Sequence, residues 1–483
     1  DASATIDRLS QWLRQGHDQS LIFLHFGVPH APYLLNGDGT QYSLAGSYGM
    51  PGWIPKEHRW SPEAPFYTTQ AFQRYLLQTM YVDQLLGRLM DSLEDSGLFQ
   101  ASTLVVTADH GVAFTPGEKR RALQFDPAVV GANNAVPLLW KSAGQTTAHR
   151  ETRNIELIDV LPTLLDELGS GADVSGMDGR PVSQPPREVK RFAGQDYAKD
   201  VWPEVLETSR ARHRAIRIAE SREGSYFVRP AKYADLIGQP IDSATPSEQT
   251  VELVNPLVLD ELKRVDMASS FRPNLIEGTL AADSTVEVVG IAINGLLADV
   301  VEVFVDDTGL RRFLSVFDPA TLEPGDNPID FVAVSPVAPE AAATGEAALQ
   351  RLRHSGDTFR LIDGVLSNAE GKPLQRDQER LVGAFDGFDH RIPGVLQIHG
   401  WLADRTTWTP PQAYLVVYQD QQHQSRPSRP RPDLTSISEG LVHAGFSTAV
   451  RLQGEHFQRD NLRMFVIFDG ETYAEMKNIE GMQ

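Results

Sequence analysis

Two short apolar runs on either side of a helical pattern constrain the fold of this chain most strongly. The runs are SLIFLHF (20–26) and TLVVT (103–107). Uninterrupted apolar segments of this length are typical of strands that are buried on both faces of a parallel sheet. Between them, apolar residues recur at spacings of three and four through residues 82–93, which predicts an amphipathic helix. Residues 20–169 are therefore predicted to form an α/β unit.

The rest of this α/β unit is predicted from two further patterns. VPLLW (136–140) is a third apolar run, and LIDVLPTLLDELG (157–169) has helical spacing. Pro162 is tolerated there only near the start of the helix. Residues 170–192 are rich in Gly, Pro and Ser, which predicts a loop and a subdomain boundary.

The C-terminal part contains a weak internal repeat of short alternating strands. One copy begins with residues 276–305 and the second with GVLQIHGWLADR (394–405). Asn294-Gly295 is a strong signal for a β-hairpin turn. Two related β-sandwich-like modules are the natural interpretation.

These patterns divide the chain into five predicted regions. They are an α/β domain (1–190), a mixed subdomain that completes it (191–270), a first β module (271–340), a linker and small insert (341–390), and a second β module (391–483).

Composition excludes several classes of function. The formal net charge of −20 argues against a nucleic-acid partner, because such proteins need clustered Lys and Arg. The 483 residues include no cysteine, so disulfides, thiolate metal sites and cysteine nucleophiles within them are excluded. No window reaches the roughly 18 uncharged apolar residues of a membrane span. Because the first residue is Asp1 and not Met, we expect a processed chain or a fragment of a longer one.

Asp109 and His110 follow the predicted strand 103–107 and are candidate metal ligands. Ligands bind beyond the carboxyl ends of strands in open α/β sheets, and a carboxylate oxygen and an imidazole nitrogen suit a divalent ion. The alternative is an ordinary strand-to-loop turn, in which Asp109 caps backbone N–H groups and His110 is exposed.

Two histidines lie in or after the first apolar run. His30 lies between Pro29 and Pro32, so the backbone around it is stiff. A rigid histidine can donate a proton or hold an anionic oxygen, although a structural role is the alternative. His25 lies inside the run, where a core role is the ordinary interpretation; it is also a candidate substrate contact.

A basic cluster follows the candidate metal ligands. Lys119, Arg120 and Arg121 lie within a dozen residues of His110. In a chain this acidic, such a cluster suggests an anionic ester substrate, with Lys119 and Arg121 as candidate contacts. A solvated loop is the alternative.

As an ordered set, these segments resemble the sulfatase-like members of the alkaline phosphatase superfamily. The set is VPHAPY, the helix YVDQLLGRLMDSLEDSGL, TLVVTADHG, VPLLW, IDVLPTLLDELG and MDGRP, and it covers roughly residues 15–185. The segments HFGVPHAPYLLNGDGTQY and DHGVAFTPGEKRR look most like a bacterial, mainly actinobacterial subgroup. In that subgroup, transmembrane helices precede the sulfatase-like domain, and the domain lies on the extracytoplasmic side of the membrane. The resemblance implies the C-terminal portion of a mixed sheet flanked by helices.

The resemblance also implies roles for individual residues. Asp109 and His110 would be two ligands of a divalent metal, Ca²⁺ or Mn²⁺. His30 would contact the transferred group or the leaving oxygen. Lys119 lies near the place where many sulfatases have an anion-binding lysine.

One departure from the family concerns the nucleophile. The first half of the family's domain, with an acidic metal ligand and a formylglycine, Thr or Ser nucleophile, has no counterpart here. We therefore expect the nucleophile and the further metal ligands upstream of Asp1. SRPSR (425–429) formally fits the Ser-x-Pro-x-Arg formylglycine signal, but it would require a circularly permuted enzyme.

Three functions remain open at this stage. The first is a metal-dependent sulfuric or phosphoric ester hydrolase outside the cytoplasm, anchored to a membrane through the upstream region. The second is a phosphoglycerol-type transferase that acts on cell-envelope polymers. The third is a non-catalytic protein whose β modules bind an envelope glycan or lipid, with Trp401, Trp408 and Tyr414 as candidate sugar contacts, although core roles are the ordinary alternative.

Overall fold

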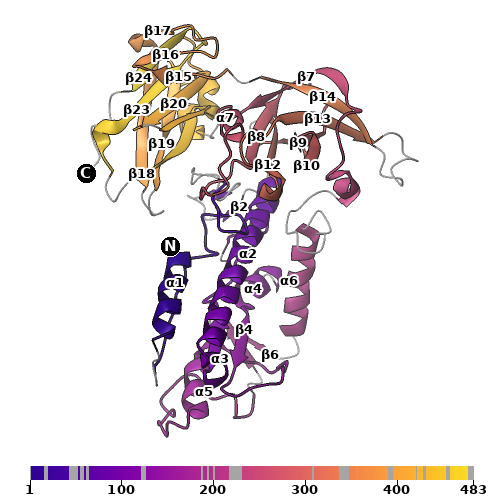
Figure 1. The fold of residues 1–483 in the computed structure, drawn as a ribbon, viewed down its shortest axis with the longest axis vertical. Helices are drawn as coiled ribbons and strands as arrows, with labels where there is room; N and C mark the ends of the chain where they lie inside the picture. Colours follow the sequence, from indigo (N-terminus) through magenta and orange to yellow (C-terminus); the bar gives the residue numbers. More distant parts are fainter. Residues whose placement is uncertain are drawn as a thin grey trace. The chain divides into compact units, whose positions relative to one another are not determined.

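The computed structural model consists of two compact units, each described here by itself (Figure 1). The first comprises Asp1–His25, Trp53–Pro62 and Leu85–Ile216, and the second comprises Phe26–Gly52, Glu63–Gln84 and Arg217–Gln483. The structure describes residues 2–15, 20–42, 53–54, 59–60, 65–120, 127–186, 189–192, 195–198, 202–216, 231–306, 309–336, 347–355, 357–389, 395–419, 421–427, 431–452 and 457–476.

Helices make up most of the first unit. They are α1 (Ala2–Leu13), the C-terminal part of α2 (Pro65–Asp95), α3 (Leu98–Ala101), α4 (Pro127–Asn134), α5 (Val160–Glu167) and α6 (Trp202–Ile216). The helix predicted over residues 82–93 is confirmed as part of α2. Hydrogen bonds join α1 to α2: Arg88 Nη1 donates to Ser3 Oγ (2.8 Å), and the hydroxyls of Ser10 and Ser92 are 2.7 Å apart.

Strands β3 (Leu104–Thr107) and β4 (Leu138–Lys141) form at two of the three predicted apolar runs. They pair antiparallel and not parallel, with Val105 opposite Trp140. None of their residues is fully buried, so the prediction of strands buried on both faces is wrong here. A two-stranded sheet gives each strand one neighbour only, so its apolar side chains keep contact with solvent.

The third apolar run, residues 20–26, is not a strand. No hydrogen bond joins the backbone of residues 21–26 to another described residue, and Leu21 and Phe23 are 90% and 87% exposed. The strand prediction is therefore wrong for this segment. Apolar composition favours a strand only where a neighbouring strand supplies hydrogen-bond partners, and no described strand pairs with this segment.

Three short hairpin or helical elements complete the first unit. β1 (Trp53–Ile54) pairs with β2 (Arg59–Trp60), and β5 (Val189–Phe192) pairs with β6 (Gln195–Ala198). The 3₁₀-helix η2 (Leu157–Asp159) leads directly into α5. Pro162 lies in the first turn of α5, as the sequence required.

A large mixed sheet dominates the first part of the second unit. Its strand order is β10-β9-β13-β14-β7-β8-β12-β11. Among the described strand pairs of this sheet, β14 and β7 are parallel and the others are antiparallel. The strands are β7 (Thr245–Leu253), β8 (Leu275–Leu280), β9 (Val288–Ile293), β10 (Leu296–Glu302), β11 (Phe304–Val305), β12 (Arg311–Val316), β13 (Ile329–Pro336) and β14 (Ala347–Ser355). The sheet thus includes strands on both sides of residues 270 and 340. The overall class, mixed α/β with a large mixed sheet, agrees with the prediction.

The β9–β10 hairpin forms as its turn sequence predicts. Asn294 and Gly295 both have positive φ (54° and 77°), which is the backbone of a type I′ turn. Ile293 and Leu296 pair across the turn. Apolar residues of this hairpin, including the fully buried Ile291, pack in the sheet's main core.

The C-terminal residues form two further sheets, with orders β17-β24-β23-β20-β21 and β18-β19-β22. The strands are β17 (Gln375–Arg376), β18 (Leu381–Asp389), β19 (Val395–Asp404), β20 (Ala413–Tyr418), β21 (Gln421–Ser425), β22 (Gly445–Arg451), β23 (Leu462–Ile467) and β24 (Thr472–Met476). One apolar cluster draws on both sheets, with Ile398 and Phe446 from one and Tyr414 and Val466 from the other.

Smaller elements connect the sheets of the second unit. They are β15 (Arg360–Ile362), β16 (Val365–Ser367), α7 (Val258–Leu262), η3 (Ala231–Leu236), η4 (Pro319–Thr321), η6 (Gln378–Arg380), η7 (Pro432–Leu434), η8 (Glu439–His443) and η9 (Arg459–Asn461).

The candidate sugar contacts and the formylglycine signal have ordinary surroundings. Tyr414 is buried in the apolar cluster, Trp401 is half-buried, and Trp408 is 38% exposed in a turn. Ser425 ends strand β21, where it pairs with Tyr414.

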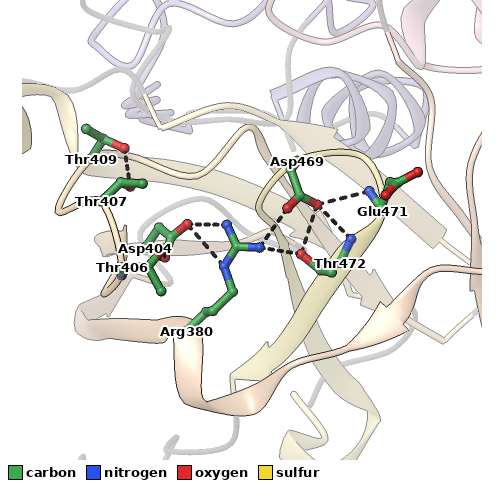
Figure 2. A network of polar contacts seen from close by, with 8 residues as sticks. All are labelled: Arg380, Asp404, Thr406, Thr407, Thr409, Asp469, Glu471 and Thr472. Carbon is green, nitrogen blue, oxygen red and sulfur yellow. Dashed lines mark hydrogen bonds and ion pairs between the residues drawn. The ribbon is translucent and has the colours of Figure 1, made fainter.

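An ion network joins three turns of the C-terminal sheets (Figure 2). Arg380 Nη1 donates to Asp469 Oδ2 and to Thr472 Oγ1, both at 2.7 Å. Its Nε and Nη2 donate to Asp404 Oδ2. Arg380 therefore holds the η6, β19 and β23–β24 turns together.

Within the described segments, no helix is long and apolar enough to cross a bilayer.

Candidate metal centre

Asp109 and His110 lie immediately beyond the C-terminal end of β3, as predicted. Asp109 Oδ1 accepts a hydrogen bond from the backbone N–H of His110 (2.9 Å). His110 Nδ1 lies 2.8 Å from the carbonyl oxygen of Gly111. A carbonyl can only accept, so Nδ1 carries the proton in this hydrogen bond and Nε2 of the neutral ring has a free lone pair.

This tautomer fits a metal ligand. Histidines that bind metals almost always donate their other ring N–H to a carbonyl or carboxylate. His110 Nε2 lies 3.4 Å from Asp109 Oδ2, so the two side chains face each other. The two side chains are 34% and 75% exposed, which leaves them accessible to an ion. The same contacts also agree with the simpler role of a capped turn.

The ligand pair is incomplete within the described segments. Nowhere in them do three or more His, Cys, Asp or Glu side chains gather in a way that could hold a metal ion. Asp109 and His110 are therefore two candidate ligands for which the described residues supply no third. Carboxylate and imidazole donors together suit Mn²⁺ better than Ca²⁺, which prefers oxygen ligands alone.

Gly111 allows a helix end to approach the candidate ligands closely. Its N–H donates to the carbonyl oxygen of Asn133 near the end of α4 (2.7 Å). A Cβ atom on Gly111 would lie 2.0 Å from the carbonyl oxygen of Ala132. Only glycine fits at this crossing, so the backbone after His110 is held against α4.

The loop after Gly111 is fixed by a buried tryptophan that sequence analysis did not identify. Trp60 is fully buried, stacks on Phe114 at 5.3 Å between ring centroids, and donates from Nε1 to the carbonyl oxygen of Ala113 (2.7 Å). The loop then turns back, since Ala113 N donates to the carbonyl oxygen of Arg120 (3.2 Å). Trp60 lies fifty residues before His110 in the sequence, and no pattern in the residues around it indicates a contact with this loop.

Lys119 is exposed on this returning loop, where its ammonium group is available to an anion. Arg121, the second basic candidate, lies outside the described residues.

The two candidate histidines fall in different units. His30 belongs to the second unit, where its N–H donates to the carbonyl oxygen of Gly27 (2.8 Å) and its Nδ1 donates to that of Ala31 (2.6 Å). Asp109 belongs to the first unit. His25 belongs to the first unit and is exposed. Its predicted core role is wrong, because the segment around it forms no buried strand.

A buried carboxylate joins two of the motifs that carry the family resemblance. Asp159 is 3% exposed and accepts hydrogen bonds from the backbone N–H groups of Glu156 and Arg180, both at 2.9 Å. Gly179 lies so close to Ile158 that a Cβ atom would be 1.8 Å from its carbonyl oxygen. IDVLP and MDGRP therefore pack together, with Asp159 of the first motif and Gly179 of the second at the contact.

Comparison with known proteins agrees with the resemblance. Residues 1–170 match the family described as "Sulfatase". Arylsulfatase K of Bos taurus is 23% identical over 194 residues, which are 34% of this chain and 35% of the relative. Arylsulfatase K of Canis lupus familiaris is 22% identical over 210 residues, 37% of this chain and 38% of the relative. The match thus spans little more than a third of these relatives.

The similarity of this chain to solved structures is weak. β-Glucuronidase 3 of Bacteroides uniformis has a TM-score of 0.12 and 11% identity, and the match covers 48% of this chain and 24% of that one. A putative membrane anchored protein from Corynebacterium diphtheriae also has a TM-score of 0.12, at 10% identity, with 48% and 60% covered. At family level, residues 1–170 of this chain are similar to sulfatases.

Proposed function

We propose that this chain is part of a metal-dependent ester hydrolase that cleaves a sulfuric or phosphoric ester on the extracytoplasmic face of a bacterial membrane. Asp109 and His110 are two ligands of a divalent ion, Mn²⁺ or Ca²⁺. When bound, the ion supplies electrostatic stabilisation to the ester oxygens. The observation that carries the proposal is the 3.4 Å approach of His110 Nε2 to Asp109 Oδ2 at the end of β3, in the region that matches sulfatases.

Other residues of the chain have supporting roles in this proposal. His30 contacts the transferred group or the leaving oxygen and moves a proton there. Lys119, Arg121 and His25 bind the anionic substrate, a cell-envelope glycan or lipid ester. The nucleophile and the remaining metal ligands come from a part of the polypeptide upstream of Asp1, which also carries the membrane anchor.

Exposed apolar side chains in the first unit support the idea that more polypeptide covers it. Residues 21–23 and 157–161 each bring several such side chains together along the chain, and clustered exposed apolar surface usually marks a contact with another segment or partner. The exposed residues of this kind are Leu21, Ile22, Phe23, Leu139, Leu157, Ile158, Leu161 and Leu168.

Hydrolysis of 4-nitrophenyl sulfate and 4-nitrophenyl phosphate by the intact protein tests the proposal. We expect one ester to be cleaved in the presence of Mn²⁺ or Ca²⁺. The variants Asp109→Ala and His110→Ala should each lower kcat/KM more than about 100-fold, because loss of even an outer partner of a metal ligand costs 10–100-fold. Asp91→Ala removes an exposed carboxylate on α2 and serves as the matched control.

Three outcomes would redirect or overturn this function. Transfer of a phosphoryl group to an acceptor alcohol, with a Thr nucleophile upstream, would establish the phosphoglycerol-type transferase. Binding of envelope glycan without turnover of either ester would establish a non-catalytic protein. Equal activity of Asp109→Ala and Asp91→Ala would remove the metal centre from the mechanism.

A further inference from the structure

The C-terminal end of α4 packs against the backbone that follows the candidate metal ligands. Two contacts define this approach: the hydrogen bond from Gly111 N to the carbonyl oxygen of Asn133, and the close passage of Ala132. The backbone of Ala132 and Asn133 therefore lies beside Gly111, the residue that follows His110.

Helical periodicity places the side chain of Asn133 on the face of α4 that is turned toward Ala113. Gly131 lies against α6, where a Cβ atom would be 2.7 Å from the side chain of Ser209. Val129 packs against Ala113 instead. Asn133 follows Val129 by four residues, so it shares the face turned toward Ala113 and away from α6.

The amide of Asn133 is buried there without hydrogen bonds. The residue is 7% exposed, and neither Nδ2 nor Oδ1 has a partner in the described part of the chain. Its neighbour Asn134 differs, since Asn134 Nδ2 donates to the carbonyl oxygen of Val130 (2.9 Å). Burying an amide without partners is unfavourable, so an unsatisfied one beside a functional site calls for an explanation.

We propose that Asn133 is a positioning residue of the metal centre, and that its amide NH₂ donates a hydrogen bond to an oxygen ligand of the bound cation. Hydrogen bonds of this kind are often long or absent without the bound group and form when it binds. Outer partners that orient ligands are a regular part of metal sites. This inference rests on the proposed function, because it assumes a cation at Asp109 and His110.

Mn²⁺ affinity of the intact protein, measured by electron paramagnetic resonance, tests this role without reference to turnover. Asn133→Leu keeps the number of side-chain heavy atoms and the branch at Cγ, and it removes the amide. We expect it to bind Mn²⁺ about 10- to 100-fold more weakly than the wild type. Asn134→Ala, next in the helix, should bind like the wild type, and Asp109→Ala should show no binding.

Metal-free stability supplies a second readout. Removing an unsatisfied buried amide relieves its desolvation cost, so we expect the melting temperature of metal-free Asn133→Leu to equal or exceed that of the wild type. Asn133→Ser keeps a hydroxyl donor and should recover part of the Mn²⁺ affinity that Asn133→Ala loses. The Ser and Ala pair also keeps the test open if Asn133→Leu does not fold.

Two results would overturn the inference and can be told apart. If Asn133→Leu and Asn133→Ala bind Mn²⁺ like the wild type while Asp109→Ala does not, Asn133 has no role at the centre and the proposed metal site stands. If the wild type binds no Mn²⁺, both this inference and the proposed metal centre are wrong.

Discussion

At the scale of single residues, glycine at position 111 decides whether the site backbone can lie against α4. Gly111→Ala would place a Cβ atom 2.0 Å from the carbonyl oxygen of Ala132. The backbone of one of the two segments must move to relieve this clash. We expect the free energy of unfolding to fall by about 1–3 kcal/mol, with weaker Mn²⁺ binding at Asp109 and His110. Urea unfolding and Mn²⁺ titration of the same preparations measure both effects.

The same substitution elsewhere in the first unit should have the opposite sign. Gly87 lies inside α2, is exposed, and a Cβ atom there would meet nothing within 4 Å. Gly87→Ala should therefore raise the free energy of unfolding by about 0.5–1 kcal/mol. Equal effects of Gly87→Ala and Gly111→Ala would show that the close approach at Gly111 has no energetic weight.

At the scale of elements, the Arg380 network predicts a pH-dependent coupling between three turns. Asp469 is partly desolvated, which raises the pKa of its carboxyl, but hydrogen bonds from Arg380 and Thr472 outweigh this and hold its pKa at about 2. The pKa of Asp404 is lowered as well, since the hydrogen bonds from Arg380 and Thr406 outweigh its desolvation. A carboxyl whose pKa is depressed by folding stabilises the fold above its unfolded pKa, about 3.9. That contribution is lost as pH falls through the folded pKa.

Arg380→Gln should therefore destabilise the protein at pH 6 and much less at low pH. We expect a loss of roughly 2 kcal/mol at pH 6, as for hydrogen bonds to charged groups, that shrinks between about pH 4 and pH 2. Urea unfolding at pH 6, 4 and 2.5 measures this difference. Arg376→Gln is the control, because the Arg376–Glu475 pair is longer (3.4 Å) and more exposed. A loss for Arg380→Gln that does not change with pH would contradict the electrostatic account.

Elements whose signals are local were predictable from the sequence, and those set by distant neighbours were not. The β9–β10 hairpin follows from Asn294-Gly295 alone, because the turn needs two residues that tolerate positive φ. The position of Asp109 and His110 beyond β3 was predictable because the apolar run marks where the strand ends. The pairing of β3 with β4, the exposure of residues 20–26 and the contact of Trp60 with the site loop depend on the rest of the chain. No periodicity reports which strand lies beside another.

At the scale of the whole molecule, the backbone amides of residues 21–26 should behave differently in this chain and in the longer protein of the proposed function. In this chain their backbone has no hydrogen bond to another described residue, so their amide hydrogens should exchange with solvent rapidly. If the upstream polypeptide of the proposed function completes a sheet here, these amides gain partners in the intact protein. Hydrogen exchange followed by mass spectrometry on both proteins should show slow exchange of this segment in the intact protein only.

Substitutions in this segment extend the same test. Leu21 and Phe23 are almost fully exposed, so Leu21→Glu with Phe23→Glu should leave the stability of this chain nearly unchanged. In the intact protein the two buried carboxylates would be strongly destabilising. Ile437→Glu, at a position of the second unit that is 54% exposed, should be neutral in both proteins. Rapid exchange of residues 21–26 in the intact protein, with a neutral double substitution, would mean that nothing covers this segment and that the catalytic domain is not completed by pairing there.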